Sequence, residues 1–248
     1  MTGIEYKELK PDPPLSDFVE SFWMLSNTTS EEKPIVLVPD GRIDLSFSLT
    51  APYDLVLLGL ESSAEQAILL PGVKMFSVSF KLLAMEYLFD RKFPTLVNTA
   101  YQLPPDYFGI TAADFKGFDA FCCSLADNFS KKLTAEIDPR HKKLFDLVYT
   151  SNGNISIHVI ADTLHWSSRQ INRYFNDWFG ISLKVYCNIL RFRASFRQIK
   201  EGRLFPEENF TDQAHFIKNV KKFAGVTPKE LKKNKNDRFI QFSTLAKK

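Results

Sequence analysis

The sequence lacks the long apolar run that a membrane span requires. A helix that crosses a bilayer needs about 18 or more consecutive apolar residues, and the 248 residues contain no such run. The opening, MTGIEYKELK, is polar and mixed in charge, unlike a secretory signal. Cysteine is scarce, and Cys122, Cys123 and Cys187 match neither a metal-binding spacing nor a disulfide framework. These absences predict a cytoplasmic protein that contacts no membrane.

Motifs of the common enzyme classes are missing as well. There is no nucleophile elbow, P-loop or HExxH pattern, and none of the four histidines precedes residue 139. The adjacent Cys122 and Cys123 could form a redox pair, but on an amphipathic helix a cysteine is more often simply buried. We therefore expect no catalytic residue, no metal site and no cofactor. An enzyme with its catalysis in the front half has the least support.

What the chain does have is a strong charge asymmetry between its two halves. Residues 1–138 carry 11 Lys/Arg and 20 Asp/Glu, a balance of −9, whereas residues 139–248 carry 21 Lys/Arg and 9 Asp/Glu, a balance of +12. Without residues 229–248 the second half still carries +7, so a basic tail alone does not explain the charge. The asymmetry predicts two domains, at 1–137 and 138–248, of which the second faces a polyanion.

The acidic half has the two-residue period of β-strands over residues 18–80. The segment RIDLSFSL (42–49) alternates strictly between apolar and polar residues, the pattern of a half-buried strand. PIVLV before it and the PDG turn at 39–41 predict a hairpin, with Gly41 at a positive φ. Many short strands at regular spacing predict a small barrel or sandwich. Further strands are expected within 53–60, 64–70 and 74–80.

Beyond residue 80 the period becomes helical. The segment 81–90 and the longer segment 111–133 both have the pattern of helices, the latter with an apolar stripe at spacings of three and four. These helices would flank the β-rich domain. The stripe consists of Phe115, Phe118, Cys122, Leu125, Phe129 and Leu133.

Three side chains of the acidic half are candidates for a ligand pocket. Arg42 and Asp44 lie on the polar face of segment 42–49, which is a solvated sheet face about twice as often as a pocket wall. Trp23 stands among apolar neighbours and is more typical of a core residue than of a ligand platform. A small-molecule effector that binds to this half therefore stays one of two alternatives.

The basic half has a helical period almost throughout. The Asp-Pro pair at 138–139 starts one helix, Ser156 caps a second, and the segment 167–180 begins at a serine and ends at a glycine. Two short helices joined by a tight turn form a helix-turn-helix, whose second helix enters the major groove of DNA. There Arg pairs with guanine, and Asn or Gln with adenine. The alternative is that the polar residues of segment 167–180 form the solvent-exposed face of an ordinary helix. The charge of +12 in this half of the chain favours DNA binding.

Residues 154–236 resemble the DNA-binding region of the AraC/XylS transcription regulators. The matching segments are ISIHVIADTLHWSSRQINRYF, FGISLKVYCNILRFRAS and NFTDQAHFIKNVKKFAGVTPKEL, in a region that covers about a third of the chain. The front half more weakly resembles the β-rich domain that precedes this module in some members, through LSDFVESFW and VPDGRIDLSF. The resemblance implies two helix-turn-helix units bridged by a long helix at 182–202, with recognition helices at 168–179 and 211–224.

The same resemblance implies which residues face DNA. In the first recognition helix these are Arg169, Asn172 and Arg173, with Ser168 and Gln170 nearby. In the second helix they are Thr211, Gln213, Ala214 and Lys218, with Lys221 and Lys222 toward phosphates.

The chain departs from the family pattern ahead of the second recognition helix. The family has a whole helix there, whereas only RLFPEE (203–208) separates Gly202 from Asn209, and a six-residue segment with a proline makes one helical turn at most. We therefore expect the first unit to read bases and the second to supply phosphate contacts or packing. His215, within the second helix, is expected to pack and hydrogen-bond rather than bind a metal.

Taken together, the sequence predicts an α+β protein. A small β-barrel or sandwich-like N-terminal domain with flanking helices would precede an all-α domain with two helix-turn-helix units, the second lacking most of its first helix. The predicted function is sequence-specific DNA-binding transcription regulation, with double-stranded DNA, a small-molecule effector and a second copy of the chain as partners. Binding by the monomer is expected to be weak. The alternative is an interaction module that has lost specific DNA reading and binds another acidic partner.

Overall fold

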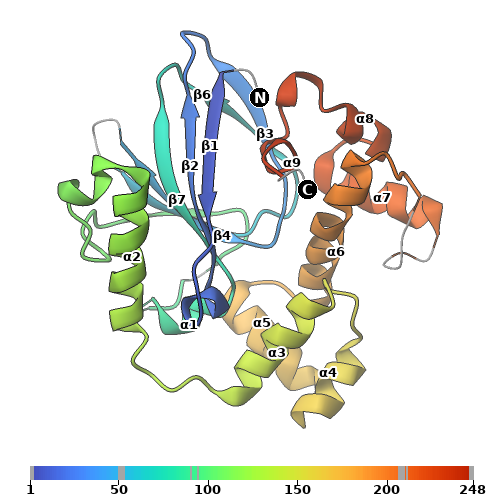
Figure 1. Cartoon of the computed structure of the whole chain (residues 1–248). Coiled ribbons are helices and arrows are strands. Elements are labelled where there is room, and N and C mark those ends of the chain that lie inside the picture. The colour runs from blue at the N-terminus through green and yellow to red at the C-terminus, as the bar shows by residue number, and fades with distance from the viewer. Residues whose placement is uncertain are drawn as a thin grey trace.

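The computed structural model describes residues 3–49, 54–89, 91–93, 95–205, 210 and 212–245, and these form an α+β fold. Antiparallel strands dominate the first hundred residues, and helices dominate the remainder. The helical region lies beside and below the sheet region in the view of Figure 1. Within the described part, no helix combines the length and apolar character that crossing a membrane would need.

Within the described residues, eight strands form two antiparallel sheets. The larger sheet has six strands in the order β1-β2-β7-β4-β5-β8, and the smaller one pairs β3 with β6. Both sheets contribute to the wall of one cavity, as in an open barrel or sandwich. The strands are β1 Ile4–Leu9, β2 Val19–Asn27, β3 Lys33–Leu37, β4 Ile43–Ser48, β5 Leu55–Leu58, β6 Glu65–Leu69, β7 Lys74–Phe80 and β8 Ala100–Leu103.

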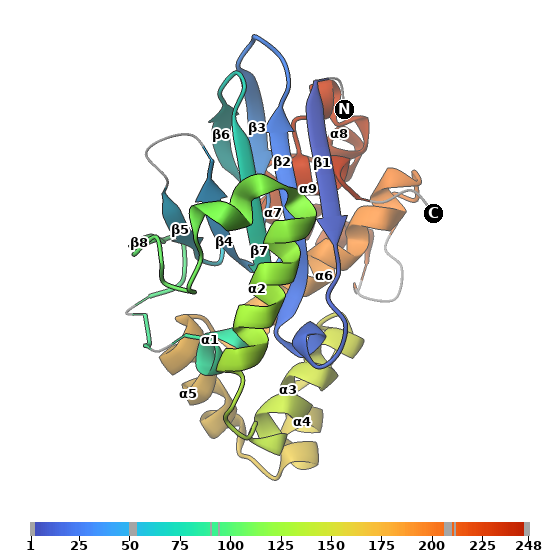
Figure 2. The same ribbon diagram turned by 60° about the vertical axis from the view of Figure 1, so that its left-hand side comes forward.

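The helices fall into two groups. The first group, α1 and α2, flanks the sheet. α2 lies across one sheet face (Figure 2), where its Phe121 packs edge-on to Phe47 at a ring distance of 5.2 Å. The others form the basic half. They are α1 Ala84–Tyr87, α2 Phe118–Lys132, α3 Pro139–Thr150, α4 Ile157–Leu164, α5 Ser168–Phe179, α6 Leu183–Lys200, α7 Gln213–Ala224, α8 Pro228–Lys233 and α9 Ile240–Ser243, with 3-10 turns at Leu15–Asp17, Ala112–Lys116 and Lys235–Asp237.

The predicted hairpin between PIVLV and RIDLSFSL is wrong. β3 pairs with β6 in the smaller sheet, whereas β4 pairs with β7 and β5 in the larger one, so the turn between them crosses from one sheet to the other. Gly41 in this turn does have the expected positive φ, at +77°. The alternation of a strand shows which face is buried but not which strand is its neighbour.

The helices of the acidic half also differ from expectation in length. The segment 81–90 contains only the single turn α1, and the segment 111–133 is divided at Gly117 into a 3-10 turn and α2. Cys122 is buried and Cys123 exposed, both as free thiols, and burial raises the pKa of Cys122 to about 12. Of the predicted stripe, Cys122, Leu125 and Phe129 are buried, while Phe115, Phe118 and Leu133 are partly buried.

One apolar core continues through both halves of the chain. Buried aromatic residues of the sheet and α2 connect with Phe145 of α3, Phe175 of α5 and Tyr186 of α6. A second cluster joins Val38 of the acidic half to α6, α7 and Phe239. The predicted boundary at 137/138 falls between α2 and α3, and the division into two domains stays a prediction.

Candidate nucleic-acid interface and ligand cavity

α4 and α5 form the expected helix-turn-helix geometry. α4 ends at His165, whose left-handed φ of +54° turns the chain, and α5 starts two residues after Trp166. The Ser167 hydroxyl accepts a hydrogen bond from the Gln170 backbone N–H, and the Gln170 side-chain oxygen accepts from the Ser167 N–H at 2.8 Å. This reciprocal capping box sets the first turn of α5. α5 ends at Gly180, which has a left-handed φ of +70°.

The two faces of α5 differ as the pattern predicted. Ile171, Phe175 and Phe179 are fully buried, and the start of the opposite face is open to solvent. Arg169 and Arg173 are exposed, and neither forms an ion pair within the described ranges. Because they are four residues apart on a helix, their guanidinium groups lie on one face, a turn apart.

The other predicted residues of this helix are either less exposed than the two arginines or already hydrogen-bonded. Asn172 and Ser168 are half-buried. Gln170 is exposed, but its amide oxygen is committed to the capping box with Ser167. Arg169 and Arg173 are therefore the best-presented base-reading candidates, and a DNA contact by any of the five stays a prediction.

Contacts from the acidic half and from α3 hold α5 in place. The Tyr174 hydroxyl donates to Glu86 of α1 at 2.7 Å, and the ring of His141 stacks on Tyr174 at 4.4 Å. Lys92 lies over the ring of Trp178 at 4.1 Å. Burial and the charge of Glu86 raise the pKa of Tyr174 far above its ordinary value, so the phenol stays a hydrogen-bond donor. α5 is thus anchored at its buried side.

α7 presents the second set of predicted residues. Asp212 caps the helix by accepting from the His215 backbone N–H at 2.7 Å. The His215 side chain is exposed, and its ring packs edge-on against Phe210 at a centroid distance of 5.8 Å, which fits the packing role that was expected. Thr211 lies outside the described residues. Gln213, Ala214, Lys218, Lys221 and Lys222 are all exposed.

The two recognition candidates differ in what precedes them. α5 follows α4 through a tight turn, whereas residues 201–205, ahead of α7, form no helix. Pro206, Asn209 and the residues between them lie outside the described part of the chain. α5 and α7 sit at opposite ends of α6 (Figure 1), whose 18 residues span about 27 Å.

A cavity of about 860 Å³ lies between the two sheets, α6 and the C-terminal segment. Trp23, Arg42 and Asp44, the three candidates for a ligand pocket, all line it. Arg42 is only 5% exposed, and Asp44 and Ser46 of β4 line the cavity too, so the polar face of segment 42–49 is a cavity wall and not a solvated sheet face. Ligand binding by these residues stays a prediction.

A partly buried ion triad joins the cavity wall to α6, with Arg42 buried and Glu20 and Arg193 partly exposed. Glu20 of β2 accepts from Arg42 at 3.1 Å and from Arg193 of α6 at 2.9 Å. Burial alone would raise the pKa of Glu20, but the two guanidinium charges outweigh it and lower the pKa to about 2. Sequence reasoning missed this pairing because Glu20 and Arg193 are 173 residues apart.

The lining of the same cavity includes three acidic residues, Asp40, Asp44 and Glu61. Asp44 accepts from the Ser79 hydroxyl, which in turn accepts from the Trp23 indole N–H at 3.0 Å. Burial and the neighbouring charge of Asp40 raise the pKa of Asp44 to about 7. Burial, Asp40 and Asp44 raise the pKa of Glu61 to about 9. Asp40 and Glu61 lie in irregular segments and carried no periodic signal in the sequence.

The C-terminal segment closes one side of this cavity. The Val36 N–H donates to the Arg238 carbonyl at 2.7 Å, and the Val38 N–H donates to the Gln241 side chain at 3.1 Å. Phe239 is 1% exposed, and Gln241 reaches the cavity wall. The segment 238–241 is therefore a packed part of the fold.

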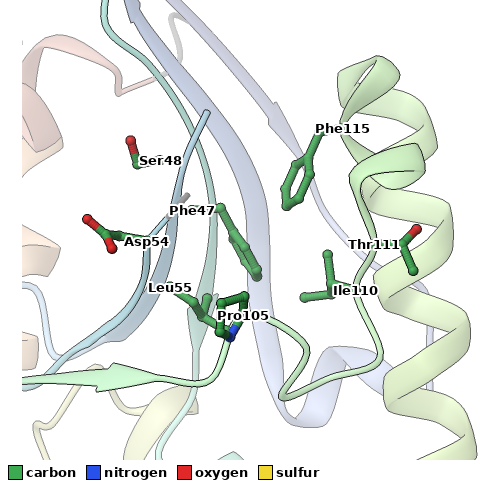
Figure 3. Close-up of a pocket in the computed structure, with 8 residues that line it drawn as sticks. All are labelled: Phe47, Ser48, Asp54, Leu55, Pro105, Ile110, Thr111 and Phe115. Atoms are coloured by element: carbon green, nitrogen blue, oxygen red, sulfur yellow. The ribbon is translucent and has the colours of Figure 1, made fainter. Parts of the chain in front are cut away.

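A second, smaller cavity of about 150 Å³ lies on the other face of the sheet. Figure 3 shows Phe47, Leu55 and Ile110 pointing toward one another, with Phe115 beside them, whereas the Asp54 carboxylate points away. Among the described residues, no polar side chains converge on this cavity. This cavity is a packing gap beneath the 3-10 turn at Ala112–Lys116 and carries no candidate site.

Comparison with known proteins leaves the function open. Residues 7–102, less than half of the chain, match a family described as "Domain of unknown function (DUF6597)", and this stretch contains Trp23, Arg42 and Asp44. No curated protein matches the chain.

Among solved structures, ToxT from Vibrio cholerae is similar at 12% identity and a TM-score of 0.41, covering 98% of each chain. ToxT bound to an unsaturated fatty acid is similar at 13% identity and a TM-score of 0.39, covering 92% of this chain and 93% of that one. A TM-score below 0.5 is too low for either likeness to carry an argument.

Proposed function

We propose that the chain is a sequence-specific DNA-binding transcription regulator that reads the major groove with the start of α5. The observation that carries this proposal is the helix-turn-helix of α4 and α5, with Arg169 and Arg173 exposed on its open face and in no ion pair with another described residue. A recognition helix needs a rigid buried side and a polar open side at its start, and α5 has both.

The charge distribution supports the same function. The half of the chain that contains both recognition candidates carries +12, and phosphate contacts by Lys and Arg dominate the affinity of proteins for DNA. The resemblance of residues 154–236 to the AraC/XylS regulators supports the order of the parts. On this proposal residues 138–248 form the DNA-binding domain, α7 adds phosphate contacts through Lys218 and Lys222, and a homodimer binds more tightly than the monomer.

The β-rich half, residues 1–137, would hold an effector in the cavity of about 860 Å³. This cavity is walled partly by Arg193 and Arg197 of α6, the helix that bridges α5 and α7. A ligand there would touch the DNA-binding half directly. A ligand controls a protein only if it binds one of two conformations more tightly than the other, so it must contact the two arrangements of this wall differently.

Selection of binding sites from random duplex DNA, with the full-length protein, tests the proposal. A regulator should enrich one sequence and bind it at least about 1,000-fold more tightly than unrelated duplex. Its affinity should also fall steeply between low and high salt, since several counterions are released.

The alternative is an interaction module for another acidic partner, favoured by the absence of a helix in residues 201–205 ahead of α7. Duplex binding without sequence preference, or no duplex binding, would favour that alternative.

A further inference from the structure

We propose that residues 238–245, which include α9, anchor α7 to the β-rich half of the chain. We call these residues the C-terminal clamp. The inference rests on the phosphate-binding role proposed for α7, and it names Phe239, Gln241 and Phe242 as positioning residues for that helix. In Figure 1, α9 lies beside β3, between the sheets and the group formed by α6, α7 and α8.

The chain ahead of α7 offers it little hold where the structure describes that chain. Residues 201–205 form no helix, and the side chain of Phe205 is 68% exposed. Phe210 contacts Phe216 of α7 at a ring distance of 5.0 Å, but Phe210 is itself only half-buried. The position of α7 therefore depends mainly on what packs against its buried face and on the chain that follows it.

The clamp docks on the second edge of β3 through hydrogen bonds. β6 pairs with one edge of β3. At the other edge the Val36 N–H donates to the Arg238 carbonyl at 2.7 Å, and Phe239 forms a parallel bridge with Val36. The Val38 N–H, just beyond β3, donates to the Gln241 side chain at 3.1 Å. Val38 is fully buried, so its N–H needs a partner within the protein, and Gln241 supplies it.

The side chains of the clamp pack into two different apolar clusters. Ile240 belongs to a cluster with Leu25 and Ile35 of the two sheets. Phe239 and Phe242 instead belong to the cluster that contains the buried face of α7. The clamp therefore bridges the β-rich half and the α7 cluster with its side chains as well as with its hydrogen bonds.

Aromatic rings lead from the clamp to α7 through α6. The ring of Phe242 lies 6.1 Å from that of Phe196 on α6. Phe196 lies 4.9 Å from Phe192, and Phe192 contacts Phe223 of α7 at 5.3 Å. Lys200, the last residue of α6, donates to the Phe242 carbonyl at 3.2 Å. The clamp thus fixes the part of α6 against which α7 packs.

The end of α8 holds the clamp in shape. Asn234 caps α8 in a left-handed conformation, and its side-chain oxygen accepts from the Phe239 N–H at 3.0 Å. The Asn234 amide donates to the Ser243 hydroxyl at 2.6 Å, and that hydroxyl donates to the Asp237 carbonyl at 2.9 Å. Since α8 follows α7 closely in the chain, the clamp fixes the exit of α7 as well as its buried face.

Two full-length variants test the anchor by hydrogen exchange. Phe239→Ala/Phe242→Ala removes the two rings that face the α7 cluster, whereas Gln241→Met removes only the acceptor for Val38. The measured quantity is the ratio of the amide exchange rate of α7 to that of α5. This ratio should rise at least about 100-fold in the aromatic variant, because buried rings are lost locally. It should rise about fivefold in Gln241→Met, which leaves one buried donor without its partner.

Matched controls separate a local anchor from general stability. Phe129→Ala opens a gap in the acidic half, where Phe129 is fully buried beside Phe22 and Phe80. Gln102→Met removes an exposed hydrogen bond to Asp54. Neither control should raise the ratio of exchange rates, because neither residue belongs to the α7 cluster.

A second readout follows the anchor through to DNA. In the native chain, Lys218→Ala should reduce the slope of log affinity against log salt by about 1. In Phe239→Ala/Phe242→Ala the same substitution should leave the slope almost unchanged, because a detached α7 no longer contacts phosphates. Arg169→Ala should keep its full effect in both backgrounds, since other contacts hold α5. A segment that only stabilised the fold would not separate these two substitutions.

Failure of the anchor and failure of the proposed function are distinguishable, because hydrogen exchange is measured without DNA. A raised ratio in the clamp variants supports the anchor even if no duplex binds, an outcome that would refute only the regulator. An unchanged ratio, or an undiminished effect of Lys218→Ala in the aromatic variant, overturns the anchor even if a DNA site is selected. If the aromatic variant does not fold, Gln241→Met compared with Gln102→Met decides the question.

Discussion

Helices α5 and α7 lie at opposite ends of α6 but are positioned by different means. α5 follows a preceding helix through a tight turn, and Glu86 of the acidic half holds its buried side through Tyr174. α7 follows a stretch whose described residues, 201–205, are not helical. Its buried side packs on α6 and α8 within a separate apolar cluster.

This difference indicates which helix is suited to reading bases. A bidentate contact between an arginine and guanine needs a side chain held in one place relative to the groove, whereas a lysine that neutralises a phosphate tolerates a looser position. α5 is a capped helix with two solvent-exposed arginines, and contacts of Glu86 with Tyr174 and of Lys92 with Trp178 hold it in place. α7 has exposed lysines and one exposed glutamine, side-chain types that can contact phosphates.

The largest effect is expected from the double variant Arg169→Ala/Arg173→Ala. Each base-reading arginine contributes about 1–3 kcal/mol of specific binding, so the pair should cost about 2–6 kcal/mol. Competition between the selected duplex and random duplex measures the loss. Lys116→Ala/Lys131→Ala, which removes the same charge from exposed positions of the acidic half, is the control. Specificity that survived the arginine variant but vanished in Gln213→Ala would reverse the roles assigned to the two helices.

Glu20→Gln should have the next largest effect, because it breaks the triad that ties the middle of α6 to the acidic half. Removing one partner of a buried ion pair costs about 3–5 kcal/mol, since Arg42 would stay buried without a counter-charge. Chemical denaturation at pH 7 measures the change in the free energy of unfolding. Glu5→Gln, in a solvent-exposed pair with Lys7, should change it very little.

The same variant has a characteristic dependence on pH. The pKa of Glu20 is lowered to about 2 in the folded protein, below its unfolded value near 4.3. Its contribution is therefore present above about pH 4.3 and is lost as the pH falls toward about 2. The gap in stability between the native chain and Glu20→Gln should narrow over that interval. A gap that stayed constant would show that Glu20 does not owe its effect to ionisation.

A smaller effect is expected from the helix caps. Ser167→Ala and Asp212→Ala remove the side chains that cap α5 and α7, at about 1 kcal/mol each. The thermal transitions should fall by similar amounts. Specific duplex binding should suffer more in Ser167→Ala, because only α5 is expected to require exact placement. Equal losses of specificity would mean that both helices read bases.

The smallest effect is expected from single lysines of α7. Lys218→Ala or Lys222→Ala should weaken binding to all duplexes alike and reduce the slope of log affinity against log salt by about 1. Titrations of selected and random duplex at several salt concentrations measure this slope. A loss confined to the selected duplex would contradict a phosphate-binding role for α7.

The helices of the basic half were predictable because their signals are local. Ser156 and Ser167 cap helices within three residues of themselves, and Gly180 ends α5 in a left-handed conformation, as expected. The buried stripe of α5 follows from its own period of 3.6 residues. Arg169 and Arg173 lie on the helix face opposite that stripe and are therefore exposed. This exposed part of the candidate site could be found without a structure.

The acidic half was less predictable because strand pairing is not local. The period of β4 correctly separated its two faces, but its partners β7 and β5 could not be chosen from adjacency, and the hairpin with β3 was wrong. For the same reason Arg42 and Asp44 could not be placed on a cavity wall. That wall exists only because the smaller sheet and α6 cover the polar face of β4.

By itself, therefore, the sequence determined the charge division, the approximate helix limits of the basic half and the solvent-exposed face of α5, all of which depend on composition or on neighbours within a turn or two. Tertiary structure alone decided the cavity, the Glu20 triad and the packing of Phe239 beside β3. The physical reason is distance along the chain. Residues that meet after folding can be 203 positions apart, as in the bond from Val38 to Gln241, and no local pattern records such a meeting.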